Sequence, residues 1–149
     1  MSLTRRIGSR TVYLDANVFI YVVEEVPLYL GVLGPLFEAV ASGQVRAVTS
    51  EVTLAEVLVH PVRNADAERE AAFVRSVRTR GGLTVVPVTR AVPVEAAQLR
   101  AATRMKLPDA IHAATARLSG CTVLLTNDAG IAAVPGVEVV RLSEVAAHG

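Results

Sequence analysis

Five short runs rich in Val, Leu and Thr constrain the fold of this chain more than any other feature of its sequence. The runs are TVYLD (11–15), VRAVTS (45–50), LTVVPV (83–88), CTVLLT (121–126) and VEVVRL (137–142). Each run is short and continuously apolar, as expected for a strand that is buried on both faces. Strands of this kind are typical of parallel sheets covered by helices.

Helical stretches separate these runs, and they lie near residues 17–24, 30–42, 51–59, 65–80, 91–105 and 109–119. Ser50 is placed to cap the third helix, Asn64 to cap the fourth, and Pro61 to stop the third. The alternation predicts an α/β fold with a central, mainly parallel sheet of about five strands. The length of 149 residues suits one domain. We place that domain at 11–149 and treat residues 1–10 as an N-terminal tail.

Composition excludes few functions but indicates the cellular compartment of the protein. Cys121 is the only cysteine, so an intrachain disulfide is impossible. We see neither a secretory signal nor an apolar run long enough for a membrane span, and we therefore expect a cytoplasmic protein. The net charge of +1 neither identifies nor excludes an RNA partner. Lys106 is the only lysine; the many arginines suit phosphate recognition or reflect a GC-rich genome.

Four acids stand out, although each has a structural explanation. Asp15 and Asp128 follow two of the predicted strands, but such residues also cap helices or close turns. Glu56 interrupts an apolar helix and faces either a site or a solvated strip shared with Thr53 and His60. Asp109 follows Pro108, where an acid also favours the positive end of a helix.

The four acids together indicate a metal site. Ligands of parallel sheets bind beyond the carboxyl ends of the strands, where Asp15 and Asp128 are expected. Converging carboxylates without basic partners repel one another, and a divalent cation removes that cost. Oxygen ligands without a thiolate suit Mg²⁺ or Mn²⁺. Such an ion orients a water molecule and stabilises charge on a phosphodiester.

The same residues resemble the PIN-domain family, and within it the VapC-type toxins of toxin–antitoxin pairs. The resemblance covers about residues 11–146. It rests on VYLDANVFIY with Asp15 and Asn17, TSEVTLAEVL with Glu56, KLPDAIHAATA with Asp109, and LLTNDAG with Asp128. The segment AGIAAVPG departs from the pattern, because many relatives carry an aromatic residue shortly after the last acid.

The resemblance implies a five-stranded parallel sheet, Mg²⁺- or Mn²⁺-dependent endoribonuclease activity, homodimers and an antitoxin that blocks the site. We expect Asp15, Asp109 and Asp128 to bind the metal directly or through water. We expect Glu56 to hold a metal-bound water or a second ion. Asn17, Thr126 and Asn127 are predicted to contact an RNA phosphate or to orient the carboxylates.

Three alternatives use the same residues. His60 and His112 follow Glu56 and Asp109 at helical spacing, but a di-iron site needs a bundle of long helices. We therefore expect His112 to be packed or to support a ligand, and His60 to lie on the surface. A phosphotransferase or receiver domain needs a second acid near Asp15, where Asn17 stands. The remaining alternative is a catalytically silent PIN fold that binds RNA or assists assembly.

An aromatic and aliphatic stretch, VVEEVPLYLGVLGPLF (22–37), points to a partner. Five of the six Tyr and Phe residues lie in or near it: Tyr13, Phe19, Tyr21, Tyr29 and Phe37. The stretch is either part of the core or an apolar groove near the active site. We expect a groove, with Leu33 exposed in it, that receives an amphipathic antitoxin helix and lets a basic side chain of that helix reach the four acids.

Overall fold

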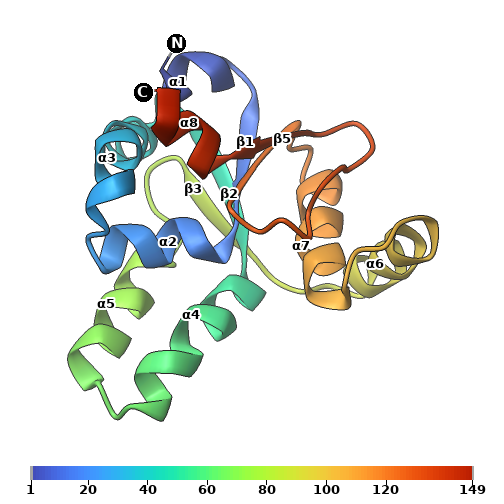
Figure 1. The fold of residues 1–149 in the computed structure, drawn as a ribbon. Helices are drawn as coiled ribbons and strands as arrows, with labels where there is room; N and C mark the ends of the chain where they lie inside the picture. The colour runs from blue at the N-terminus through green and yellow to red at the C-terminus, as the bar shows by residue number, and fades with distance from the viewer. Residues whose placement is uncertain (1, 149) are drawn as a thin grey trace.

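The computed structural model describes residues 2–148 and confirms an α/β fold with a five-stranded parallel sheet (Figure 1). The strands are β1 (Thr11–Leu14), β2 (Arg46–Ser50), β3 (Leu83–Val86), β4 (Val123–Thr126) and β5 (Glu138–Arg141). Their order across the sheet is β3-β2-β1-β4-β5, and every neighbouring pair is parallel. The sheet therefore extends in both directions from a central β1.

Helices connect the strands and cover both faces of the sheet. They are α1 (Leu3–Ile7), α2 (Ala16–Val23), α3 (Pro27–Ala41), α4 (Glu51–Arg63), α5 (Ala67–Ser76), α6 (Ala91–Ala102), α7 (Leu107–Leu118) and α8 (Leu142–His148). One apolar core lies under α1, α2, α3, α5 and α8, and the second lies under α6 and α7. In Figure 1, α4 and α5 form an antiparallel pair that extends below the sheet.

The strand sequences divide their side chains between these two cores. In β1, Val12 and Leu14 belong to the core under α2 and α3, and Tyr13 belongs to the core under α7. Successive side chains of a strand point to opposite faces of the sheet. Helices cover both faces, so all three side chains are fully buried. This alternation sends the phenol of Tyr13 toward α7, which matters for the site described below.

The strand order creates a switch point at the carboxyl ends of β1 and β4. The chain moves outward from β1 to β2 and β3, then returns across the sheet to β4 on the other side of β1. Leu14 pairs with Leu125, so the two strands end side by side. Ligand sites of open parallel sheets form at such a point, because the loops that leave the strands diverge there.

Several local expectations need correction. Pro61 does not stop α4, which continues to Arg63 although a proline lacks the N–H that would bond to the carbonyl of Val57. Asn64 ends α4 instead of capping α5, whose N-cap is Asp66, and Ala65 between them adopts a φ of 52°. Ser50 caps α4 as expected, since its hydroxyl accepts from the N–H of Val52.

Both ends of the chain contain structure that the sequence analysis did not assign. Residues 1–10, which we treated as a tail, include α1, whose Leu3 and Ile7 are buried in the core. Arg6 and Arg10 form ion pairs with Glu138, and these contacts attach this segment to β5. At the other end, α8 packs against α3.

The aromatic and aliphatic stretch is largely part of the core. Leu33 and Leu36 are fully buried and Tyr29 nearly so, which shows that the expected exposure of Leu33 is wrong. No single helix among residues 2–148 is long and apolar enough to cross a membrane. The bent pair α2 and α3 passes that test by length and composition, as the buried helices of a soluble core also do.

Candidate metal centre

Four acids gather around the carboxyl ends of β1 and β4, and each is placed by a different element. Asp15 directly follows β1 and precedes α2, and Asp128 lies in the loop after β4. Glu56 lies in the middle of α4, and Asp109 lies in the first turn of α7. The sheet topology therefore brings together residues that are up to 113 positions apart in the sequence.

Asp15 is held in place by two hydrogen bonds. Its Oδ1 accepts from the N–H of Ala16 at 2.7 Å, and its Oδ2 accepts from the hydroxyl of Thr126 at 2.6 Å. The first bond begins α2, so the structural interpretation of Asp15 as a helix cap is also correct. The side chain is buried, and its orientation is therefore fixed before any ligand binds.

Glu56 and His112 complete a group with Asp15. Nε2 of His112 hydrogen-bonds to Oε1 of Glu56 and lies 3.5 Å from Oδ1 of Asp15. One donor atom from each of the three residues lies within 4.8 Å of the other two, a spacing that could hold a metal ion. The alternative of a solvated strip that Glu56 shares with Thr53 and His60 does not hold for Thr53, which is fully buried.

His112 is buried and oriented by a second contact. Its Nδ1 lies 2.6 Å from the hydroxyl oxygen of Tyr13, and the two rings meet edge to face. Burial alone would lower the pKa of His112, but the hydrogen bond with Glu56 and the charge of Asp15 outweigh it, and the pKa is raised. Burial and the charge of Asp15 also raise the pKa of Tyr13, which stays a neutral phenol.

Asp109 and Asp128 form the second half of the site. Burial, a hydrogen bond with Asp128 and the charge of that carboxyl raise the pKa of Asp109 to about 6. The pKa of Asp128 is lowered: burial opposes this, but the N–H of Gly130, the bond with Asp109 and the charge of Arg141 favour the ionised form. The two carboxyls therefore share a proton when no cation lies between them.

The polar residues predicted to support the acids have distinct places. Thr126 orients Asp15, as described above. Asn17 accepts a hydrogen bond from the backbone N–H of Asn127. The Asn127 amide donates to the hydroxyls of the stacked Tyr21 and Tyr29 and accepts from the N–H of Ser143. Asn127 thus connects the loop after β4 with α2, α3 and α8.

The donor set fits a divalent cation. Among the described residues, neither arginine nor lysine forms an ion pair with any of the four acids. Arg141 and Lys106 both act on the charge of Asp128, but the guanidinium of Arg141 donates to the backbone oxygens of Asp128 and Ile131. Several carboxylates with one imidazole and no thiolate are ligands of a hard or borderline metal ion.

From the sequence we expected Asp15 and Asp128 at this edge and gave His112 only a packing or supporting role. The residue is packed as expected, yet its Nε2 hydrogen-bonds to Glu56 and faces Asp15. The signal for this arrangement was weak, because the i, i+3 spacing from Asp109 does not reveal where α7 lies relative to β1.

Comparisons with known proteins agree with this architecture. The model of the PIN-domain family matches residues 12–137. The comparison with curated proteins found no match.

Solved structures show the same fold at low sequence identity. A toxin–antitoxin complex from Klebsiella pneumoniae is 23% identical, with 88% of this chain and 97% of that chain covered and a TM-score of 0.66. DNA-bound VapBC from Salmonella typhimurium is 22% identical, with 89% and 98% covered and a TM-score of 0.69. A sarcin–ricin-loop-cleaving VapC toxin from Mycobacterium tuberculosis is 16% identical, with 76% and 86% covered and a TM-score of 0.60.

Proposed function

The chain belongs to the PIN-domain family, and we propose that it is a divalent-metal-dependent endoribonuclease, the toxin of a toxin–antitoxin pair. The observation that carries the proposal is the convergence of four carboxylates at the switch point without an arginine or lysine ion pair among the described residues. One solved relative is described as a toxin that cleaves the sarcin–ricin loop, which supports RNA as the class of substrate.

We assign the following roles to the site residues. Asp15, Asp109 and Asp128 would hold Mg²⁺ or Mn²⁺ directly or through water, and Glu56, at the open side of the group, would bind the ion or a water molecule on it. The bound ion would lower the pKa of a water molecule and stabilise charge on the phosphodiester. Thr126 keeps Asp15 in its rotamer, and the bond between Asn17 and Asn127 holds the loop that carries Asp128. Glu56 is about two-fifths exposed and can move toward substrate or water, whereas Asp15 cannot.

Cleavage of a defined RNA with and without metal tests the proposal. Asp15→Asn and Asp109→Asn should each lower the rate by at least ~100-fold, because each removes a negative ligand of the ion. EDTA should stop the wild type, and Mg²⁺ or Mn²⁺ should restore it. Asp66→Asn is a matched control, because Asp66 caps α5 outside the site. Wild-type rates in both site variants would show that the chain does not use these acids.

The alternative is a catalytically silent PIN fold that binds RNA or assists assembly. Calorimetric titration separates the two functions, because a silent module has no need of an ion. A silent module should bind Mg²⁺ or Mn²⁺ equally weakly before and after Asp109→Asn. The nuclease should bind the ion measurably, and the variant should bind it at least ~10-fold more weakly.

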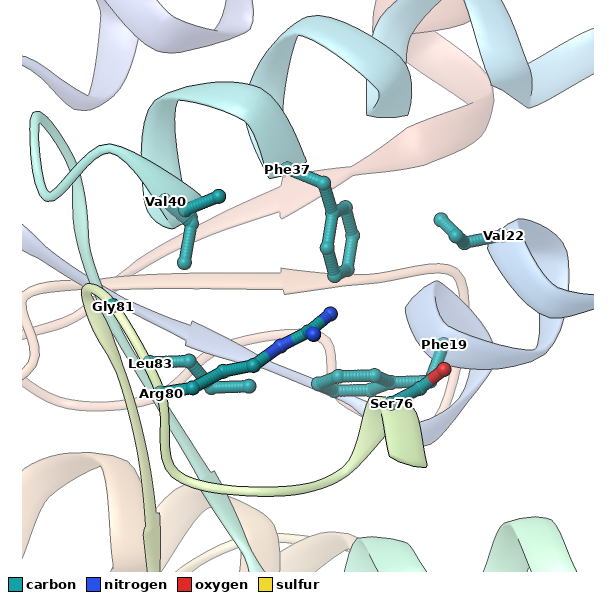
Figure 2. A pocket seen from close by; sticks show the side chains of 9 residues that line it. Phe19, Val22, Phe37, Val40, Ser76, Arg80, Gly81 and Leu83 are labelled. Atoms are coloured by element: carbon teal, nitrogen blue, oxygen red, sulfur yellow. The ribbon is translucent and has the colours of Figure 1, made fainter. Parts of the chain in front are cut away.

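We also propose a binding surface for the antitoxin in an apolar groove between α2, α3 and the start of β3 (Figure 2). The groove encloses about 350 Å³ and is lined by Phe19, Val22, Phe37, Val40, Ala41, Ser76, Arg80, Gly81 and Leu83. The rings of Phe19 and Phe37 meet edge to face at 5.8 Å. Only Val22 and Phe37 of the stretch 22–37 line this groove, and Leu33, which we expected in it, is buried.

Arg80 adds a positive charge to a groove that is otherwise mostly apolar. Its side chain reaches toward the two phenyl rings in Figure 2, and none of the ion pairs among residues 2–148 includes it. The tight turn at Gly81 and Gly82 fixes its backbone: a Cβ on Gly81 would lie 2.7 Å from the carbonyl oxygen of Ala41. An antitoxin segment with an acidic residue beside an aliphatic or aromatic one would fit this groove.

The homodimer that the resemblance implies remains a prediction. Val94, Leu107 and Leu118 are each about half exposed on α6 and α7, but separate apolar residues on a surface are common in monomers. Sedimentation equilibrium of the purified chain measures the association directly.

A further inference from the structure

The nitrogen of His112 that faces the acids is placed as a metal ligand would be. The ring is buried, and Nε2 lies 3.5 Å from Oδ1 of Asp15. Two ligands of one ion, each about 2.0–2.2 Å from it, lie roughly 3–4 Å apart. The distance between Nε2 and Oδ1 falls in that range without any movement of either side chain.

The other nitrogen of the ring has the partner that a metal-bound histidine needs. Metal-binding histidines donate the N–H of their second ring nitrogen to an acceptor, which fixes the ring and its tautomer. The Tyr13 hydroxyl lies 2.6 Å from Nδ1, and its oxygen can accept that proton. With the proton on Nδ1, the lone pair of Nε2 points toward Asp15 and Glu56.

The contact between His112 and Glu56 is compatible with an ion in this place. Nε2 and the carboxylate oxygen of Glu56 both carry lone pairs, so their hydrogen bond needs a proton between them. A divalent cation can take the place of that proton. Glu56 is the most exposed member of the group and has room to move outward by the distance that the larger ion requires.

We propose that Nε2 of His112 is a direct ligand of the metal ion, with Asp15 and Glu56, and that this nitrogen makes the site prefer Mn²⁺ to Mg²⁺. The inference rests on the proposed function and specifies which class of divalent metal ion the site prefers. Mg²⁺ strongly prefers oxygen ligands and near-ideal octahedral geometry. Imidazole favours transition-metal ions, whose affinities rise from Mn²⁺ along the first row.

Two measurements on the full chain, after removal of any affinity tag, test the proposal. Electron spin-echo modulation of bound Mn²⁺ should show coupling to one ¹⁴N nucleus, and labelling the histidines with ¹⁵N should change it to a ¹⁵N coupling. Calorimetry should show that Mn²⁺ binds at least ~10-fold more tightly than Mg²⁺. Absence of a nitrogen coupling in the wild type would overturn the proposal.

Substitutions identify which histidine supplies the nitrogen. His112→Gln should abolish the coupling and lower the affinity for Mn²⁺ by at least ~10-fold, with a much smaller change for Mg²⁺. His60→Gln should keep both the nitrogen coupling and the wild-type affinity for Mn²⁺, because His60 is exposed on α4 and bonds to Asn64. Tyr13→Phe keeps the imidazole but removes the acceptor of Nδ1–H, so the coupling should persist while Mn²⁺ binds more weakly. Equal losses of both metals in His112→Gln would show that the ring only supports the fold.

If His112→Gln does not fold, circular dichroism will show it, and the wild-type ¹⁵N-histidine spectrum with His60→Gln and His148→Gln as controls then decides, because the chain has three histidines. The outcomes also separate this inference from the proposed function. Cleavage of RNA with Mg²⁺, lost in Asp109→Asn but without nitrogen coupling, would support the nuclease and overturn the role of His112. A nitrogen coupling without any cleavage would support the ligand and count against the nuclease.

Discussion

A Cβ atom on Gly130 would lie 2.4 Å from Oδ2 of Asp109, so the loop after β4 and the first turn of α7 meet with no room for a side chain. The same Cβ would lie 3.1 Å from Oδ1 of Asp128. The N–H of Gly130 donates to that oxygen at 2.8 Å. Gly130 therefore lets the two carboxyls approach one another and holds one of them.

Gly130→Ala should impair the metal centre while leaving the fold intact. The new methyl group must push the Asp109 carboxyl away from Asp128. A displaced ligand binds the metal ion more weakly. We expect at least ~10-fold weaker Mn²⁺ binding and a comparable loss of RNA cleavage. Gly31→Ala is the matched control: apart from its chain neighbours no atom lies within 4 Å of its added Cβ, and alanine at this exposed position of α3 should raise stability by about 0.5–1 kcal/mol. Calorimetry and thermal unfolding measure both effects, and unchanged metal binding in Gly130→Ala would contradict the steric argument.

Much of the fold could be predicted because each strand is recognisable from its own short sequence. All five lie inside the predicted runs, since a continuous run of branched residues suits a strand buried on both faces. The ends of the chain could not be read in the same way. The five residues of α1 are too few to establish a helical period from two apolar positions, and the segment is placed by tertiary contacts: Leu3 and Ile7 are buried in the core, and Arg6 and Arg10 pair with Glu138.

The site was harder to predict than the fold, because it depends on tertiary distances. Asp15 and Asp128 could be placed at one edge from the parallel strands alone. The position of His112 depends on the crossing of α7 over β1, and Tyr13 stands opposite it only because its side chain leaves the α7 face of the sheet. A groove was expected in the stretch 22–37 near the active site, but only Val22 and Phe37 of that stretch, and none of the four acids, line this pocket. Helical spacing does not reveal which side of α3 meets the sheet.

Asp15 has two roles, and stability measurements can separate them. As a cap, its carboxylate accepts from Ala16, and asparagine can replace it there. In EDTA, Asp15→Asn should therefore melt at the wild-type temperature or above it, because it also relieves repulsion within the site. Asp15→Ala loses the cap and should be less stable by about 1 kcal/mol. Added Mn²⁺ should raise the melting temperature of the wild type only. A sharp drop in Asp15→Asn would show that the negative charge itself stabilises the fold.

Without metal, stability should depend on pH through Asp109. Its pKa is raised to about 6 by burial and by Asp128, whereas in the unfolded chain it is about 3.9. Between these values the folded state holds a proton that the unfolded chain has lost. The contribution is thus fully present below about pH 4 and is lost as the pH rises through about 6. Urea unfolding in EDTA should show a steeper decline over this interval for the wild type than for Asp109→Asn. Parallel curves for the two proteins would mean that Asp109 is ionised in the folded state throughout.

The groove offers a prediction that is independent of the metal centre. Arg80 is exposed at the rim of an apolar pocket, where an attractive charge fixes the register of a bound segment more than it adds affinity by area. Arg80→Glu should weaken binding of the proposed antitoxin by at least ~10-fold. RNA cleavage in the absence of antitoxin should not change, because Arg80 lies among Phe19, Phe37 and Leu83 and contacts none of the four acids.

Arg78→Glu is the matched control for this experiment. Arg78 is also exposed and lies two residues away, but it does not line the groove. The two variants carry the same net charge, so any loss caused by long-range electrostatics should appear in both. A loss confined to Arg80→Glu, and recovered when an acidic residue of the antitoxin is replaced by arginine, would identify the pair directly. Equal affinities for the two variants would place the antitoxin elsewhere, because a segment seated between the phenyl rings cannot avoid the reversed charge.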